Sequence, residues 1–182
     1  VYCWNMGRNL GPRPGVVEAC LKRIDELRQV HERKVSLIGW SLGGLFAREL
    51  AKMRPHDVRI VVSLGSPLAG PRGASNAAGI YQRLNPTSGN EPPRFQQLKR
   101  APSVPTTSIY SRSDGVVAWP CSIQDDSAHT ENIHVHASHM GMGANPAALR
   151  VIADRLAQPE GAWKPYVKES LQSRVFGRCL KY

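Results

Sequence analysis

The sequence has no long hydrophobic run and relatively few acidic residues. No apolar stretch of the 182-residue chain approaches the roughly 18 residues of a membrane-spanning helix, so we expect no stable membrane insertion. The chain contains 24 Lys and Arg residues but only 14 Asp and Glu residues, which gives a formal net charge of +10. The basic residues are dispersed, whereas a nucleic-acid binder usually clusters them or interleaves them with aromatic residues. We therefore expect a solvated basic surface and no nucleic-acid partner, while weak surface contact with anionic lipid or acidic substrates stays open.

Closely spaced cysteines are also missing. The four cysteines form no C-x-x-C pair; they are Cys3, Cys20, Cys121 and Cys179. This usage is typical of buried or free thiols in a reducing compartment and favours a cytoplasmic location, although a disulfide stays open. Apolar residues make up 41% of the chain and charged residues 21%, as in globular proteins. The length suits a single domain over residues 1–182.

Strand and helix patterns alternate along the chain. Short β-branched or alternating runs predict strands, and apolar residues at helical spacing predict helices. The predicted strands are residues 1–6, 35–38, 58–64, 104–110 and 132–137. The predicted helices are residues 14–32, 45–53 and 146–157, the last with Leu149, Ile152, Ala153 and Leu156 facing inward. This order predicts an α/β fold with a mostly parallel sheet and helices on both faces.

Residues 68–103 interrupt the alternation. They are rich in Gly, Pro, Ser and Asn, and only two short segments within them have helical character. A stretch of this length without clear elements is usually functional. We interpret it as a cap or lid over the site, with a mobile surface insertion as the alternative.

A G-x-S-x-G pattern occupies residues 39–43, between a predicted strand and a predicted helix. This context is typical of a nucleophile elbow, a sharp turn that exposes a serine at a sheet edge. The glycines around Ser41 leave room for the crossing chain. The helix that follows directs its N–H groups toward the serine, where negative charge develops in acyl transfer. We expect Leu42 to supply one oxyanion N–H from its backbone.

An acid and a histidine follow the serine in the order nucleophile, acid, base. Asp114 and His139 each come just after a predicted strand, and the carboxyl ends of parallel strands share one edge of the sheet. A serine hydroxyl needs a base to remove its proton and a third group to orient that base. We therefore predict Ser41, Asp114 and His139 as a catalytic triad. The rival acids are Asp125 and Asp126.

Two other histidines lie close to His139 in the sequence and are alternatives for the base. His134 and His136 precede His139, and the H-x-H-x-x-H pattern could indicate a zinc site. No Asp or Cys stands at metal-site spacing beside them, so we expect no metal. His139 is preferred as the base because it lies beyond the strand, in a glycine-bearing loop that can reach the serine, with His136 as the alternative.

Four segments together resemble α/β-hydrolases of the bacterial esterase and lipase kind. The matching segments are residues 4–12 (WNMGRNLGP), 39–44 (GWSLGG), 113–117 (SDGVV) and 138–146 (SHMGMGANP). The resemblance implies an α/β-hydrolase fold that hydrolyses carboxylic, lipid-like esters or thioesters through an acyl-enzyme, without a metal or organic cofactor. It also implies that the first strands and the oxyanion loop lie upstream of Val1, so that this chain alone lacks part of its site. The alternative is that the loop after Met6, with Gly7, Arg8 and Asn9, supplies the second oxyanion donor.

Two other functions stay open at this stage. The same triad could pass the acyl group to an alcohol, which would make the protein an acyltransferase, or the fold could serve a non-catalytic binding protein. The apolar neighbours of the serine favour an apolar acyl group in a small-molecule ester substrate, and we predict Trp40 as a substrate-binding residue.

Overall fold

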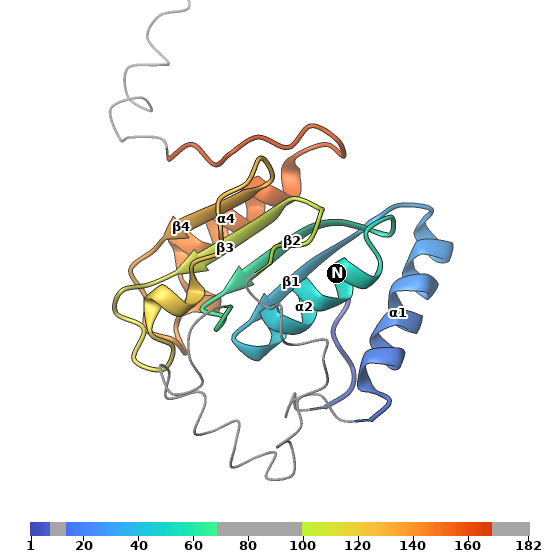
Figure 1. The fold of residues 1–182 in the computed structure, drawn as a ribbon, viewed down its shortest axis with the longest axis horizontal. Helices are drawn as coiled ribbons and strands as arrows, with labels where there is room; N and C mark the ends of the chain where they lie inside the picture. The colour runs from blue at the N-terminus through green and yellow to red at the C-terminus, as the bar shows by residue number, and fades with distance from the viewer. Residues whose placement is uncertain (8–13, 69–99, 169–182) are drawn as a thin grey trace, which may run out of the picture.

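The computed structural model describes residues 1–7, 14–68 and 100–168. These residues form a β-sheet flanked by α-helices (Figure 1). Four strands are present: β1 (Val35–Trp40), β2 (Val58–Leu64), β3 (Thr106–Tyr110) and β4 (Thr130–His134). They form one parallel sheet in the order β1-β2-β3-β4. All four arrows point the same way in Figure 1, so the carboxyl ends of the strands share one edge of the sheet. The prediction of a mostly parallel α/β fold is confirmed.

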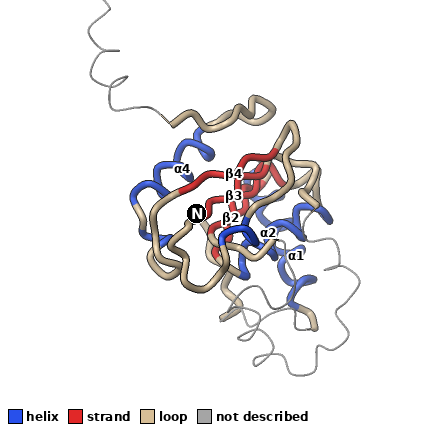
Figure 2. The backbone as a smooth tube through the Cα atoms, turned by 60° about the vertical axis from the view of Figure 1, so that its left-hand side comes forward, coloured by secondary structure: helices blue, strands red, loops and turns tan. Residues whose placement is uncertain are grey.

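Helices cover both faces of the sheet. α1 (Val16–His31) and α2 (Leu42–Met53) lie on one face, and α4 (Pro146–Ala157) lies on the other (Figure 2). Two short 3-10 turns, η2 (Trp119–Ser122) and η3 (Met142–Ala144), lie in the loops after β3 and β4. No helix in the described ranges is both long enough and apolar enough to cross a membrane.

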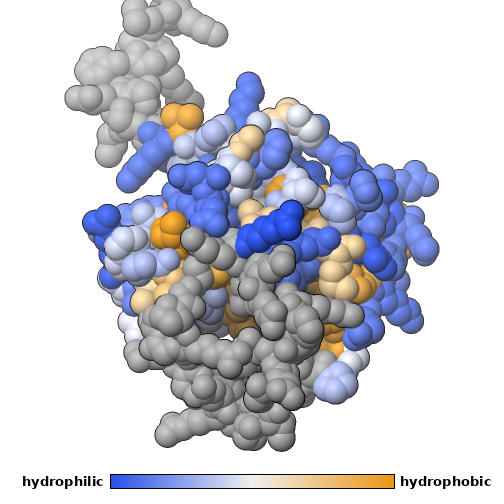
Figure 3. All heavy atoms as spheres, in the orientation of Figure 1, coloured by the Kyte–Doolittle hydropathy of each residue, from blue (hydrophilic) through white to orange (hydrophobic). Residues whose placement is uncertain are grey.

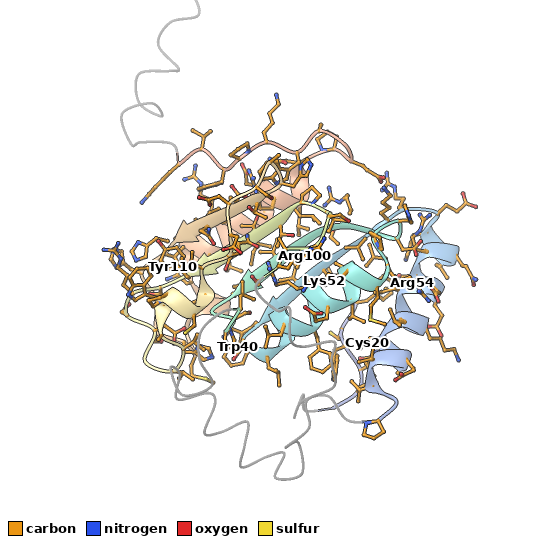
Figure 4. The ribbon with its side chains drawn as sticks, in the orientation of Figure 1. Cys20, Trp40, Lys52, Arg54, Arg100 and Tyr110 are labelled. Carbon is orange, nitrogen blue, oxygen red and sulfur yellow. The ribbon has the colours of Figure 1, made fainter. Side chains whose placement is uncertain are left out.

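The alternation of side chains along β2 divides the core into two clusters. Val61 faces the first cluster, which includes Cys20 of α1 and Ala51 of α2. Val62 faces the second, which includes Val151 of α4. Figure 4 shows Cys20 on the side of α1 that turns toward α2, and the outward surface over α1 is mainly hydrophilic (Figure 3). Burying β2 on both faces explains why its sequence is a nearly continuous apolar run.

The predicted strand at residues 1–6 is wrong. These residues have no regular structure, and Asn5 has a left-handed φ of 56° that an extended strand does not allow. The Trp4 indole donates a hydrogen bond to the Gly7 carbonyl oxygen at 2.9 Å, and its ring packs edge-on against Phe46. The segment therefore folds on itself against α2.

β4 and α4 also differ from the sequence prediction, and α2 begins at Leu42, three residues earlier than predicted. β4 begins at Thr130 and ends at His134, two to three residues earlier than predicted. The Val135 N–H still donates to the Tyr110 carbonyl oxygen of β3, but beyond it the His136 carbonyl accepts a hydrogen bond from the Asn145 side chain. In α4 the buried residues are Ala148, Val151 and Arg155, whereas Leu149, one of the residues predicted to face inward, is 47% exposed. The predicted cap at residues 68–103 lies mostly outside the described residues.

Cys20 and Cys121 are buried, Cys3 is exposed, and none of the three is in a disulfide; Cys179 lies outside the described residues.

Candidate functional site

Ser41 occupies the junction between β1 and α2, at the carboxyl edge of the sheet. Its backbone has φ 54° and ψ −123°, a combination that is costly for a residue with a side chain. The Ser41 N–H donates to the Leu64 carbonyl oxygen at 2.8 Å, which anchors the turn to the end of β2. A strained serine fixed between a strand and a helix is the geometry predicted for the elbow.

The glycines of the elbow have unequal roles. A Cβ on Gly39 would lie 2.2 Å from the Gly43 carbonyl oxygen, and a Cβ on Gly44 would lie 2.0 Å from the Ser66 hydroxyl oxygen. A Cβ on Gly43 would meet nothing within 4 Å. The close approach of strand and helix therefore depends on Gly39 and Gly44, and the final glycine of G-x-S-x-G is sterically open.

The hydroxyl of Ser41 does not cap the helix. A serine at this position usually accepts a hydrogen bond from the N–H groups of the first turn, but Ser41 forms no such side-chain bond. The first turn of α2 contains no acidic residue, so no carboxylate neutralises the positive end of the helix dipole there. Leu42 is the first helical residue, and its N–H has no acceptor within the helix. An N–H without an acceptor in its own helix, next to a serine with a strained backbone, suits the stabilisation of an oxyanion.

Asp114 and His139 form a buried pair at the same edge. Oδ2 of Asp114 lies 2.7 Å from Nδ1 of His139, and the two side chains are 2% and 5% exposed. Oδ1 accepts hydrogen bonds from the N–H groups of Val116 and Val117 at 2.9 and 2.8 Å. These two bonds fix the carboxylate and leave Oδ2 to accept a hydrogen bond from Nδ1–H. A proton on Nδ1 would leave Nε2 of a neutral imidazole free to accept a proton, which is the role required of a base.

Ser111 connects the segment that bears the acid with the segment that bears the histidine. Its buried hydroxyl accepts from the N–H groups of Ser113 and Ala137 at 3.2 and 3.1 Å. The Ser113 hydroxyl in turn donates to the Ala137 carbonyl oxygen at 3.2 Å. The turn after β3 and the loop after β4 are thereby held together.

Gly65, directly after β2, lies beside the acid–histidine pair. A Cβ there would stand 2.9 Å from Oδ2 of Asp114 and 3.3 Å from Nδ1 of His139. Sequence reasoning missed both Ser111 and Gly65. The only available signal was their position directly after a predicted strand, which many structural residues share.

The indole of Trp40, the residue before Ser41, also contacts His139. Its Nε1–H donates to the His139 carbonyl oxygen at 3.0 Å, and the two ring centroids are 5.2 Å apart. Figure 4 shows Trp40 at the end of β1. In the part of the chain that the structure describes, no hydrogen bond joins the Ser41 hydroxyl to His139, and the link between the two segments runs through Trp40.

The rival residues lie elsewhere. Asp125 and Asp126 are exposed in the loop that leads to β4. His134 and His136 contact each other with ring centroids 4.7 Å apart, and His134 also contacts Tyr110. The described ranges contain no group of three His, Cys, Asp or Glu side chains that could hold a metal ion.

Comparison with known proteins gives a family and a fold. A sequence model of the family described as palmitoyl protein thioesterase matches residues 10–113, more than half of the chain, including the elbow. No curated protein matches the sequence.

Solved structures with the same fold include lipases and esterases. A lipase B from Aspergillus fumigatus superposes with a TM-score of 0.61 at 20% identity, over 81% of this chain and 42% of the lipase. A monoacylglycerol lipase from Paleococcus ferrophilus gives 0.53 at 18% identity, over 76% and 74% of the two chains. An esterase from Pyrococcus furiosus gives 0.56 at 15% identity, over 78% and 60%. The chain thus spans less than half of the fungal lipase, and the three likenesses establish an α/β-hydrolase fold.

Proposed function

The chain belongs to the palmitoyl protein thioesterase family, and on this premise we propose that it hydrolyses acyl esters or thioesters through a serine acyl-enzyme. The observation that carries the proposal is the buried hydrogen bond between Asp114 and His139, at the sheet edge where the strained turn holds Ser41. A nucleophile, a base and an orienting acid at one edge form the arrangement that acyl transfer requires.

In the first half of the reaction, Nε2 of His139 accepts the hydroxyl proton while the Ser41 oxygen bonds to the substrate carbonyl carbon. Asp114 keeps the proton on Nδ1 and stabilises the imidazolium that forms. The Leu42 N–H donates to the developing oxyanion. The tetrahedral intermediate then expels the alcohol or thiol, which takes the proton from His139, and the acyl group remains on Ser41.

In the second half, a water molecule attacks the acyl carbon while His139 accepts one of its protons. The intermediate releases the carboxylic acid, and the proton returns to the Ser41 oxygen. Every proton that leaves the serine or the water therefore passes through His139. An alcohol in place of water would make the same acyl-enzyme a transferase.

The two predicted roles next to the serine form part of the proposal. The Leu42 N–H supplies one oxyanion donor, and the second belongs to a residue that the described ranges do not identify. The exposed face of Trp40 borders the serine and suits contact with an apolar acyl group.

The test uses the full-length protein with a fluorophosphonate probe and with p-nitrophenyl acyl esters and acyl thioesters of increasing chain length. Covalent labelling of Ser41 and ester or thioester turnover are expected, and both should disappear in Ser41→Ala. Ser127→Ala, which removes a hydroxyl from the loop before β4, is the control and should retain both. A wild-type protein that is folded but neither labelled nor active would refute the proposal, and product analysis with added methanol separates hydrolysis from transfer.

A further inference from the structure

Trp40 contacts His139 in two ways, by a hydrogen bond from its indole N–H and by packing of the two rings. The two residues are 99 positions apart in the sequence. The indole N–H donates to the His139 carbonyl oxygen at 3.0 Å, and the rings lie 5.2 Å apart at an interplanar angle of 40°. The Trp40 residue is 41% exposed, so the contact takes up only part of the ring.

The backbone of His139 has few other anchors. His139 lies between β4 and η3, outside any helix or strand. Its carbonyl oxygen also accepts a turn hydrogen bond from the Met142 N–H, but at 3.4 Å this bond is long. The Trp40 indole is therefore the better of the two donors to this carbonyl group.

Trp40 is also the residue that directly precedes Ser41. A peptide bond fixes it to the proposed nucleophile, and a hydrogen bond fixes it to the proposed base. The orientation of the imidazole is set from its far side, where Nδ1 meets Asp114, but the position of its backbone relative to the serine is not set by that bond. The indole is the direct side-chain link, within the described residues, between the elbow and the His139 segment.

We propose that Trp40 is a positioning residue, whose indole N–H holds the His139 backbone at the distance from Ser41 that proton transfer requires. This inference rests on the proposed function, and it adds a positioning role for the indole N–H to the substrate contact proposed for the exposed ring face. A residue that only binds substrate changes KM when altered, whereas a residue that aligns the base changes kcat.

The test removes the N–H donor while an aromatic ring is kept at position 40. Trp40→Phe removes the indole N–H, and replacement of Trp40 by 3-benzothienylalanine substitutes sulfur for N–H in a ring of nearly the same size. Trp119→Phe is the matched control, because Trp119 has a similar exposure of 38% and stacks on Tyr110. Thermal unfolding of each variant shows that it is folded.

Two readouts are measured in the full-length protein. The first is the steady-state kinetics of ester hydrolysis, with the rate of fluorophosphonate labelling. The second is the low-field proton resonance of His139 Nδ1–H, assigned by its loss in His139→Gln, and its exchange with water. The resonance reports the Asp114–His139 bond independently of turnover.

For both Trp40 variants we expect kcat and the labelling rate to fall about tenfold. KM should stay within about twofold of wild type in the 3-benzothienylalanine variant, which keeps a ring of nearly the same size. We also expect the His139 resonance to broaden through faster exchange. Trp119→Phe should match the wild type in both readouts.

A rise in KM at unchanged kcat would overturn the proposal, as would kinetics and a resonance equal to those of wild type. If the wild type proves inactive, the proposed function fails and the resonance still decides this inference: broadening in the Trp40 variants supports the positioning contact, and an unchanged resonance overturns it.

Discussion

Gly65 lies so close to Asp114 that a single added methyl group would stand 2.9 Å from the carboxylate oxygen Oδ2. This is the oxygen that pairs with His139, and Gly65 has a left-handed φ of 53°. The end of β2 therefore forms a wall behind the acid–histidine pair. Both the space and the backbone conformation require glycine there.

Gly65→Ala is expected to disturb the pair directly. The methyl group would displace the Asp114 carboxylate from His139, and we expect at least about a tenfold loss of kcat from the misplaced base. The strained backbone should lower the free energy of unfolding by about 1 kcal/mol or more. Gly143→Ala is the control, since a Cβ there meets nothing within 4 Å. Ester hydrolysis and urea denaturation measure the two effects, and equal behaviour of the variants would contradict the prediction.

The elbow glycines provide a second pair of variants. A Cβ on Gly44 would lie 2.9 Å from the Ser63 Cβ as well as against the Ser66 hydroxyl, so we expect Gly44→Ala to lower the free energy of unfolding by about 2 kcal/mol or more. Gly43 lies in the first turn of α2 with open space around it, and Gly43→Ala should be neutral or stabilising by up to about 1 kcal/mol. Urea denaturation measures the free energy of unfolding of both variants. A larger loss in Gly43→Ala than in Gly44→Ala would contradict the packing described for the elbow.

The assignment of Asp114 as the acid of the proposed triad can be tested by a substitution that removes the charge of its side chain and keeps the size. Asp114→Asn keeps the side-chain volume, but an amide can donate to Nδ1 and so favours the wrong tautomer of His139. We expect kcat to fall by about 10³-fold or more. Asp126→Asn, in the exposed loop of the rival acids, should retain activity. Should Asp126→Asn lose as much activity as Asp114→Asn, the assignment of the acid would be wrong.

Much of the fold follows from local patterns in the sequence. The β2 prediction coincides with the structure because a strand buried on both faces is a continuous apolar run bounded by turn residues. The elbow could be predicted because the close approach of β1 and α2 requires glycine at positions 39 and 44, on either side of Ser41. Asp114 and His139 could be paired because parallel strands end at a common edge.

Other features depend on partners distant in the sequence. Arg155 was not predicted on the inward face of α4 because it is charged, and it is buried together with its ion-pair partner Glu131, 24 positions away. Nothing in the local apolar pattern predicts such a pairing. Likewise, the bond from Trp40 to the His139 carbonyl joins residues that no motif connects, and residue type alone suggested a substrate contact for Trp40.

We expect His134 to make the stability of the fold sensitive to acid. Burial lowers its pKa below the ordinary value of 6.5, and the positive groups of His136, Arg112 and Lys168 lower the pKa further. Between the lowered pKa and 6.5 the unfolded chain binds more protons than the folded chain, so the free energy of unfolding falls as pH falls through this window. His134→Gln should reduce that pH dependence, as measured by urea denaturation between about pH 7.5 and pH 5. Equal slopes for variant and wild type would contradict the assignment to His134.

Arg155 attaches the segment after α4 to the sheet. Its guanidinium, 1% exposed, donates to Glu131 Oε1 at 2.8 Å and to the Lys164 carbonyl oxygen at 2.6 Å. The second oxygen of Glu131 accepts from the Tyr166 N–H at 2.7 Å, so one ion pair holds two points of the segment. Arg155→Met leaves a buried carboxylate without its cation, and we expect it to lower the free energy of unfolding by about 3 kcal/mol.

The double variant Arg155→Met/Glu131→Met removes both charges and should cost less than the sum of the two single variants, because neither charge is then buried alone. Asp154→Asn is the control: Asp154 also pairs with Arg155, but its side chain is 46% exposed, and an exposed pair contributes little. Urea denaturation of the four variants gives the coupling energy of the Arg155–Glu131 pair. Additive losses would mean that the pair is not coupled, and the segment after α4 would then be held by the packing of Tyr166 against Arg155 and the second core cluster instead of by charge.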